Sequence, residues 1–254
     1  MPAYRAVLFD FFNTLTRPAN RGRRHTLVAD QLGCTTRELL DVLDQSFYLR
    51  ASGVLGNAEE TLRWVCERIG VRPSDTRIQA ALTARLDAVR ADTRLRPEAV
   101  PTLRALRQLG IATALVSDCT HELPVLLAEL PVAPLLDTEV YSVQVGCCKP
   151  DPMIYLTACQ RLGVAPGDCL YVGDGGSREL TGAVGTGLAA VRLLAPDLGN
   201  HLVFDPDTGF TGPALTSLRE VIGLVEPAPA GTAHPVAVRG RPAQGRRRPA
   251  LRAR

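Results

Sequence analysis

The sequence predicts an α/β fold, in which a doubly wound parallel sheet carries an inserted all-helical domain. Short apolar runs alternate with amphipathic helical patterns in residues 1–16 and 97–225, whereas residues 17–96 carry helical patterns alone. Hydrophobic residues make up 46% of the chain and charged residues 22%, a balance typical of packed domains. The length of 254 residues accommodates this core together with a second, smaller domain.

Four continuous apolar runs are typical of strands that helices cover on both faces. They are residues 6–9, 111–116, 169–172 and 188–191. Amphipathic patterns at 97–109 and 151–162 each end before a glycine, a residue that often terminates a helix. Because strands alternate with helices, these segments predict a parallel, Rossmann-like sheet as the core.

The long connection after the first strand lacks strand-like runs. Its apolar spacing predicts helices at 26–32, 36–50, 58–69 and 77–91. A connection of this length inside an α/β domain usually forms a lid or a substrate-binding domain. We therefore expect residues 17–96 to form a helical cap that selects the substrate.

The C-terminal residues 226–254 differ in composition from the rest of the chain. Pro, Ala, Gly and Arg dominate there without periodicity, which predicts a disordered tail. Residues 229–254 hold seven Arg and no acid, and they account for the net charge of +3, because residues 1–228 carry 22 cations against 26 anions. A solvated tail is the preferred interpretation of the Arg-Arg-Arg run at 246–248, and non-specific contact with nucleic acid is the alternative.

The seven cysteines predict reduced thiols, because no Cys-x-x-Cys pair and no Cys/His cluster with zinc spacing occurs. The N-terminus lacks the pattern of a cleavable signal, and no apolar run approaches the roughly 18 residues of a membrane span. We therefore expect a cytoplasmic protein without a membrane partner. None of these features indicates an oligomeric state.

Residues suited to anion chemistry follow the predicted strands, at the edge where parallel sheets bind ligands. Asp10 ends the first strand, and a carboxylate at this point can act as a covalent nucleophile. Thr14 and Ser117 offer hydroxyl groups to an anion, and Lys149, the single lysine beside 28 arginines, offers an ammonium group. Taken one at a time, each of these residues is also explained as a turn or cap residue.

A glycine-rich turn follows the third strand, with the sequence Gly-Asp-Gly-Gly-Ser-Arg-Glu at residues 173–179. Its two acids, Asp174 and Glu179, are the kind of ligand that Mg²⁺ prefers, together with water and substrate oxygens. The glycines allow the backbone to approach such a site closely. An ordinary loop is the alternative interpretation of this segment.

In order and spacing, these strand-end residues resemble the haloacid dehalogenase superfamily. The hallmark of that family is Asp-x-Asp-x-Thr, followed by Ser or Thr, by Lys, and by Gly-Asp with a further acid. The resemblance covers about residues 4–194. The helical block is similar to the cap that the family inserts just after its first motif. The resemblance implies a hydrolase.

The resemblance also assigns catalytic roles. It implies that Asp10 attacks the substrate and forms a covalent acyl-type intermediate, which water then cleaves. Thr14 and Ser117 would donate hydrogen bonds to the bound anion. Lys149 would hold Asp10 ionised and offset charge in the transition state.

The cofactor that the resemblance implies is Mg²⁺. Its expected ligands are the carboxylates of Asp10, Asp174 and Glu179 and the backbone carbonyl of Phe12. The ion would clamp phosphoryl oxygens against the nucleophile. A small phosphorylated molecule is accordingly the expected substrate.

Substrate contacts are expected from Thr14, Ser117, Asp118 and Lys149 in the core and from Arg50 in the cap. Arg50 follows an aromatic pair and precedes two glycines, where a helix can end near the cleft. We expect Arg50 to contact the anionic part of the substrate. A solvated surface arginine is the alternative.

The chain departs from the family pattern at Phe12, Asp118 and Glu179. Family phosphatases place a second Asp at position 12 as general acid and base, and losing such a group costs about 10²–10⁴-fold in rate. An aromatic residue there is similar to the dehalogenase branch, whose halide leaving group needs no proton. Asp118 stands where Asn is frequent, and Glu179 stands where Asp is usual.

Three hypotheses remain open. A Mg²⁺-dependent phosphohydrolase is the preferred one and is favoured by Asp174, since the dehalogenase branch uses no metal. A 2-haloacid dehalogenase-type hydrolase without metal is favoured by Phe12. A catalytically weakened member that binds a phospho-ligand or a protein is favoured by Phe12 together with Glu179.

Overall fold

A computed structural model describes residues 4–199 and 201–226 of the chain. Its centre is a six-stranded sheet in which all strands are parallel, in the order β3-β2-β1-β4-β5-β6. The strands are β1 (Ala6–Phe9), β2 (Ala112–Ser117), β3 (Thr138–Tyr141), β4 (Cys169–Gly173), β5 (Ala189–Leu193) and β6 (Ala214–Leu215). The predicted α/β fold class is confirmed. The predicted disordered tail lies outside the described residues, apart from residue 226.

The central strand β1 is buried on both faces, as its continuous apolar run predicts. Val7 and Phe9 belong to the hydrophobic core on one face of the sheet, and Ala6 and Leu8 to the core on the other. The alternation follows from the two-residue repeat of a strand. Asp10 is the first polar residue after this run, so the strand delivers it to the C-terminal edge of the sheet.

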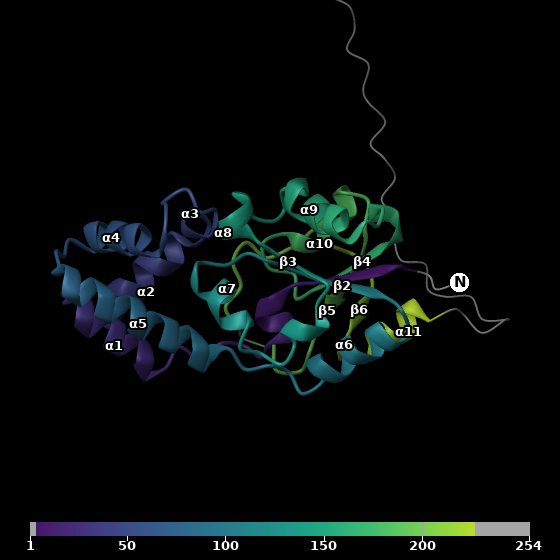
Figure 1. The fold of residues 1–254 in the computed structure, drawn as a ribbon, viewed down its shortest axis with the longest axis horizontal. Helices are drawn as coiled ribbons and strands as arrows, with labels where there is room; N and C mark the ends of the chain where they lie inside the picture. The colour runs from purple at the N-terminus through teal and green to yellow at the C-terminus, as the bar shows by residue number, and fades with distance from the viewer. Residues whose placement is uncertain (1–3, 200, 227–254) are drawn as a thin grey trace, which may run out of the picture.

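Helices cover both faces of the sheet. On one face lie α6 (Ala99–Gln108) and α11 (Glu220–Val225), and on the other lie α9 (Pro152–Leu162) and α10 (Glu179–Gly185) (Figure 1). The shorter elements near the C-terminal edge are η1 (Phe11–Leu15), α7 (Glu122–Leu127) and α8 (Ser142–Val145). Single 3₁₀ turns at η2 (Ala133–Leu135) and η3 (Pro166–Asp168) precede β3 and β4.

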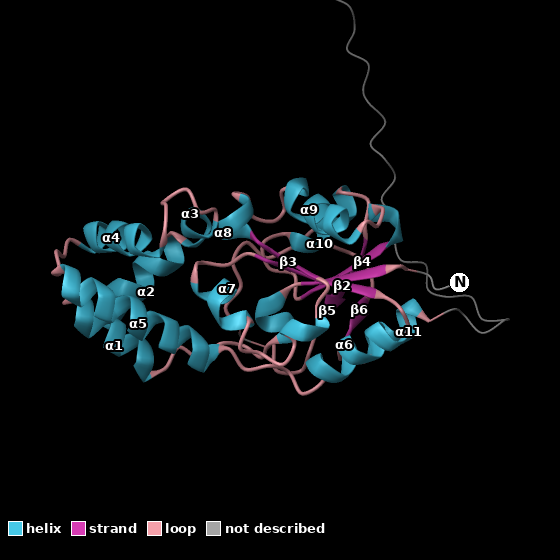
Figure 2. Cartoon of the chain, viewed as in Figure 1, coloured by secondary structure: helices cyan, strands magenta, loops and turns pink. Residues whose placement is uncertain are grey.

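The inserted cap consists of helices only and forms a separate lobe beside the sheet (Figure 2). Its helices are α1 (Arg23–Leu32), α2 (Thr36–Gln45), α3 (Phe47–Ala51), α4 (Ala58–Ile69) and α5 (Asp75–Asp92). The lobe has a hydrophobic core of its own, to which α1, α2, α4 and α5 contribute. An antiparallel bridge between Thr16 and Leu95 joins the two chain segments that connect the cap to the sheet.

The cap differs from its prediction in one helix. The single helix expected at 36–50 is divided into α2 and α3 at Ser46. The Ser46 hydroxyl donates to the carbonyl of Val42 at 2.6 Å, and such a side-chain bond competes with the helical pattern. The division turns α3 toward the sheet, where it packs near α8.

Two expectations from composition concern the whole chain. All seven cysteines are free thiols, as predicted. Within residues 4–199 and 201–226, no helix combines the length and the hydropathy that crossing a membrane requires.

Candidate active site

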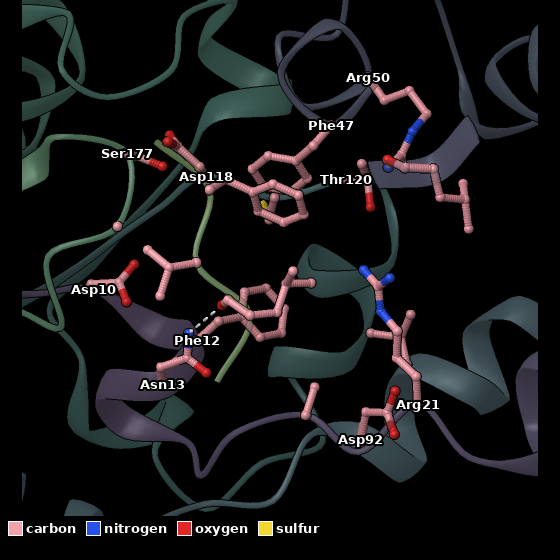
Figure 3. Close-up of a pocket in the computed structure, with 18 of the residues that line it drawn as sticks. Asp10, Phe12, Asn13, Arg21, Phe47, Arg50, Asp92, Asp118, Thr120 and Ser177 are labelled. Atoms are coloured by element: carbon pink, nitrogen blue, oxygen red, sulfur yellow. Dashed lines mark hydrogen bonds between the residues drawn. The ribbon is translucent and has the colours of Figure 1, made fainter. Parts of the chain in front are cut away.

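A pocket of about 190 Å³ lies between the C-terminal edge of the sheet and the cap (Figure 3). It is smaller than the roughly 300–1,000 Å³ of pockets for drug-sized ligands, which indicates a small ligand. Most of the predicted site residues line it: Asp10, Phe12, Arg50, Asp118, Lys149, Asp174 and Glu179. Residues from both lobes therefore meet in one site.

Asp10 is held at the pocket by the turn that follows β1. Its backbone N–H donates to the carbonyl of Val172 at 2.9 Å, which fixes it against β4. The turn then passes through Asn13 in the left-handed region, with φ of 65°. Asn tolerates this conformation better than most residues. The Asp10 side chain is 8% exposed.

Lys149 lies at the centre of the site. Its Nζ donates to Asp10 Oδ1 at 2.7 Å, to Glu179 Oε2 at 2.6 Å and to the Tyr171 hydroxyl at 3.3 Å. Burial alone would lower the pKa of Lys149, but the two carboxylates raise it well above its ordinary value. Lys149 is therefore a fixed positive charge beside Asp10.

The pKa of Asp10 is raised to about 6, chiefly because burial disfavours its charge. Lys149 opposes this shift and Asp174 adds to it. Near neutral pH the group is mainly ionised, which is the form that a nucleophile needs.

Glu179 is fully buried and both of its oxygens are engaged. Oε1 accepts from the backbone N–H of Gly175 at 2.9 Å, and Oε2 accepts from Lys149 and from the Tyr171 hydroxyl at 2.8 Å. A Cβ on Gly173 would come within 2.1 Å of Oε1, so this glycine makes room for the carboxylate. Direct metal ligation by Glu179 would compete with these bonds and stays a prediction.

Asp10, Asp174 and Glu179 form the cluster that fits a divalent cation. One carboxylate oxygen from each lies within 4.8 Å of the others, and hard oxygen donors suit Mg²⁺. Although burial acts against it, hydrogen bonds from His201 and the Gly176 N–H lower the pKa of Asp174 below its usual value. Asp174 is thus ionised, as a metal ligand must be. The predicted role of the Phe12 carbonyl is untested.

The two predicted hydroxyl donors are buried but do not line the pocket. Thr14 is fully buried, and its Oγ1 has no hydrogen-bond partner. Ser117 is also fully buried, and its hydroxyl reaches only the Asp118 carbonyl, at 3.5 Å. A buried hydroxyl without a firm partner is uncommon, which is compatible with a missing ligand. Their contact with a bound anion stays a prediction.

Asp118 and Arg50 both line the pocket. Asp118 Oδ1 accepts from the backbone N–H of Lys149 at 2.9 Å, while Oδ2 has no partner, and burial raises the pKa of Asp118. Arg50 is only 4% exposed, so its interpretation as a solvated surface arginine is wrong. The expected contact of Arg50 with the anionic part of the substrate remains a prediction.

Several residues at the site were not expected from the sequence. Tyr171 looked like an ordinary strand residue, yet its hydroxyl bonds to both Lys149 and Glu179. His201 contacts Asp174 at 2.8 Å from a loop without a motif, and this contact raises the pKa of His201. His25, on the first helix of the cap, lines the pocket and pairs with Asp92 of the same cap at 2.8 Å.

Comparisons with known proteins agree with this geometry. The chain is 30% identical over 198 residues to the glyceraldehyde 3-phosphate phosphatase of Methanopyrus kandleri, covering 74% of this chain and 83% of that one. It is 34% identical over 100 residues to (S)-2-haloacid dehalogenase 1 of a Pseudomonas species, covering 38% and 43%. The solved 2-haloacid dehalogenase of Pseudomonas syringae superposes with a TM-score of 0.62 at 21% identity, covering 87% and 97%.

The family model described as haloacid dehalogenase-like hydrolase matches residues 4–185. That range begins before β1, contains the whole cap and ends with α10, so it includes Asp10, Asp118, Lys149 and Asp174 of the pocket. Leu202, Val203 and Phe204, which line the pocket from the loop after β5, lie outside it. Because this model matches well over half of the chain, and a phosphatase relative is 30% identical to it over 198 residues, the chain belongs to the family of haloacid dehalogenase-like hydrolases.

Proposed function

We propose that this hydrolase is a Mg²⁺-dependent phosphohydrolase that acts on a small phosphorylated metabolite. One observation carries the proposal: the carboxylate of Asp10 lies 2.7 Å from Lys149 in a small pocket, within one cluster of acids with Asp174. A carboxylate beside a fixed cation and a metal-binding acid is suited to attack on a phosphoryl group. The 30% identical glyceraldehyde 3-phosphate phosphatase supports the same reaction class.

In the proposed mechanism, an oxygen of Asp10 attacks the phosphorus and the bond from phosphorus to the ester oxygen breaks, which gives an aspartyl phosphate and an alkoxide or aryloxide that takes its proton from water. Water then cleaves this acyl phosphate, releasing inorganic phosphate and restoring the Asp10 carboxylate. Lys149 keeps Asp10 ionised and offsets negative charge as the bonds change. Mg²⁺ held by Asp10 and Asp174 would neutralise charge on the phosphoryl oxygens.

Phe12 sets the expected leaving-group preference. It lines the pocket two residues after Asp10, and a phenyl ring cannot give a proton to the departing alcohol. The enzyme should therefore favour substrates whose leaving group needs little protonation. We expect slow turnover of simple alkyl phosphates.

The test is hydrolysis of p-nitrophenyl phosphate with and without Mg²⁺, using the wild type and Asp10→Asn. Its aryl leaving group departs without a general acid, so Phe12 matters least with this substrate. We expect turnover that requires Mg²⁺ and that Asp10→Asn abolishes. Turnover that persists in Asp10→Asn, or no turnover of any phosphate ester, would overturn the proposal.

A 2-haloacid dehalogenase is the second candidate, and Phe12 is the observation that favours it. Halide departs without a proton, so this chemistry does not need an acid at position 12. The discriminating measurement is halide release from a 2-haloacid in the presence of a chelator. Release that survives chelation and disappears in Asp10→Asn would establish this candidate in place of the first.

We also propose that the enzyme works in the cytoplasm, since its seven cysteines are free thiols and reduced thiols are typical of that compartment. Fractionation of cells that express the full chain tests this. Recovery outside the cytoplasmic fraction would contradict it.

A further inference from the structure

We propose that the cap side of the pocket is a subsite for a second anionic group of the substrate, bound by Arg50. The inference rests on the proposed function for the first anionic group, the phosphate at Asp10. It narrows the substrate class to small phosphorylated molecules that carry a carboxylate or a further phosphate at the other end.

The first observation is that Arg50 is a buried cation without an acidic partner. Arg50 is 4% exposed, and its guanidinium group donates to two neutral acceptors, the Ser46 hydroxyl at 3.1 Å and the Leu43 carbonyl at 2.7 Å. Among the described residues, no carboxylate forms an ion pair with it. A guanidinium group has five N–H donors, so three are left for a ligand.

The two other arginines that line the pocket each form an ion pair with a carboxylate, and Arg50 does not. Arg21 pairs with Asp44 at 2.6 Å, and Arg85 pairs with Glu122. Burial, and then the neighbouring Arg85, lowers the pKa of Arg50 to about 9, while Glu122 and Asp44 act in the opposite direction without pairing with it. A buried charge without a direct ion pair is costly, and an anionic ligand would supply that partner.

The second observation is the position of Arg50 in the pocket. Figure 3 shows Arg50 and Arg21 on one side and Asp10 on the other, with the rings of Phe12 and Phe47 between them. All five residues line the same cavity. A bound molecule would therefore have one anionic end at Asp10 and Lys149, a short apolar middle, and a second anionic end at Arg50.

The chemistry of this second end follows from the guanidinium group. Its planar fork matches a carboxylate or a phosphate through paired hydrogen bonds. A neutral carboxamide has a similar shape but no charge, so it would leave Arg50 uncompensated. The subsite should thus distinguish an acid from its amide.

The test measures binding of non-hydrolysable probes by calorimetry with Mg²⁺ present, so that it does not depend on turnover. The probes are phosphonocarboxylic acids of two to four carbons, their carboxamides, and the corresponding alkane bisphosphonates. We expect the wild type to bind at least one acid or bisphosphonate at least about tenfold more tightly than its amide, as one hydrogen bond to a charged group implies. If the bisphosphonates bind more tightly than the phosphonocarboxylic acids, the second anion is a phosphate. If the phosphonocarboxylic acids bind more tightly, the second anion is a carboxylate.

Variants then attribute the preference to Arg50. Arg50→Gln should lose the preference for acid over amide, and Arg50→Lys should keep part of it. Arg72 is an exposed arginine of the cap, so Arg72→Gln is the matched control and should bind the probes as the wild type does. Thermal unfolding shows which variants are folded. If Arg50→Gln is not folded, the ratio of acid affinity to amide affinity in Arg50→Lys takes its place as the test, and this ratio should be lower than in the wild type.

The outcomes separate this inference from the proposed function. Equal binding of acids, bisphosphonates and amides by the wild type would overturn the subsite, even where aryl phosphate turnover depends on Asp10. A preference that Arg50→Gln leaves intact would also overturn it. A preference that depends on Arg50, in a protein that hydrolyses no phosphate ester, would support the subsite while the phosphohydrolase proposal fails.

Discussion

The ring of Phe12 occupies the place of a proton-transferring side chain. Its backbone is extended, with φ of −69° and ψ of 135°, and its ring meets Phe11 edge-on with centroids 5.1 Å apart. The side chain is half-buried and lines the pocket with Asp10. Any residue can adopt this backbone conformation, and an aspartate side chain is smaller than a phenyl ring. Position 12 should therefore accept an aspartate.

Phe12→Asp should therefore increase turnover of an alkyl phosphate. The new carboxyl group would protonate the departing alcohol, a contribution of about 10²-fold or more when the geometry is right. Turnover of p-nitrophenyl phosphate should change much less, because its leaving group needs no acid. Steady-state kinetics with both substrates check this, and Phe12→Asn is the control of equal shape. An equal gain on both substrates would contradict a proton-transfer role.

The carboxyl group of Asp10 should titrate near pH 6 in the metal-free protein, because burial raises its pKa to about 6. Saturating Mg²⁺ should move the midpoint downward, since the cation binds the ionised form. Carbon-13 NMR of labelled Asp carboxyls measures both, with Asp10→Asn for assignment. A midpoint near 4 without metal would contradict the expectation.

The same shift has a consequence for stability. The folded state holds the Asp10 proton more tightly than the unfolded chain, whose Asp titrates near 3.9. The contribution of Asp10 to the free energy of unfolding should therefore fall as pH rises from about 4 to about 6. Urea unfolding at several pH values in this range gives the free energy of unfolding of the wild type and of Asp10→Asn. The free energy should fall more steeply with pH in the wild type than in Asp10→Asn.

At the level of elements, Arg96 connects η1, the turn after Asp10, to the hinge, by which we mean the chain segment around residues 93–98 that leads from the cap back to the sheet. It begins the return to the core, is 5% exposed, and donates to the carbonyls of Asn13 at 2.8 Å and Thr14 at 3.0 Å. Its Nη1 lies 2.7 Å from Asp197, in the loop that also carries His201. One guanidinium group thus joins η1, the hinge and the loop after β5.

Arg96→Gln should lower the free energy of unfolding by about 3 kcal/mol, because it leaves the carbonyls of Asn13 and Thr14 and the carboxylate of Asp197 without their donor. Arg96→Lys should restore part of this loss, since one amine reaches fewer partners. Arg94→Gln, an exposed neighbour, is the control. Denaturant unfolding measures all three. A loss in Arg96→Gln no larger than that in Arg94→Gln would refute the connecting role.

Strands that were predictable from sequence lie in the middle of the sheet. β1, β2, β4 and β5 are continuous apolar runs because helices cover both of their faces. The edge strands were missed for physical reasons. β3 begins with Thr138 and Glu139, which are only partly buried, and β6 has two residues, too few for any pattern.

The candidate site divides in a similar way. Asp10, Lys149 and Asp174 were predictable because the carboxyl ends of parallel strands meet at one edge. Tyr171 and His201 were not, since their contacts depend on how the folded chain returns to that edge. Their neighbours along the chain gave no signal of this.

For the whole molecule, two lobes close over one charged site. Phe47 of the cap stacks on Phe204 of the core with ring centroids 4.4 Å apart, and Tyr48 donates to Ser177 at 3.1 Å. These contacts lie beside the pocket, in which Asp10 and Asp174 lie close together with side chains that are only 8% and 4% exposed. In such a setting the repulsion between carboxylates is strong, and Asp174 contributes to the raised pKa of Asp10.

A divalent cation should relieve this repulsion and so stabilise the whole fold. A ligand at 100 times its dissociation constant adds about 2.7 kcal/mol to stability, which for a chain of this size raises the melting temperature by about 5–10 °C. We expect Mg²⁺ to produce this rise in the wild type and to have almost no effect in Asp174→Asn. Asp30→Asn, an exposed acid of the cap, should respond as the wild type does, and potassium chloride at equal ionic strength should not replace Mg²⁺. The measurement is thermal unfolding by circular dichroism. Because stabilisation by binding does not require turnover, an equal rise in Asp174→Asn would exclude this metal site whatever reaction the enzyme catalyses.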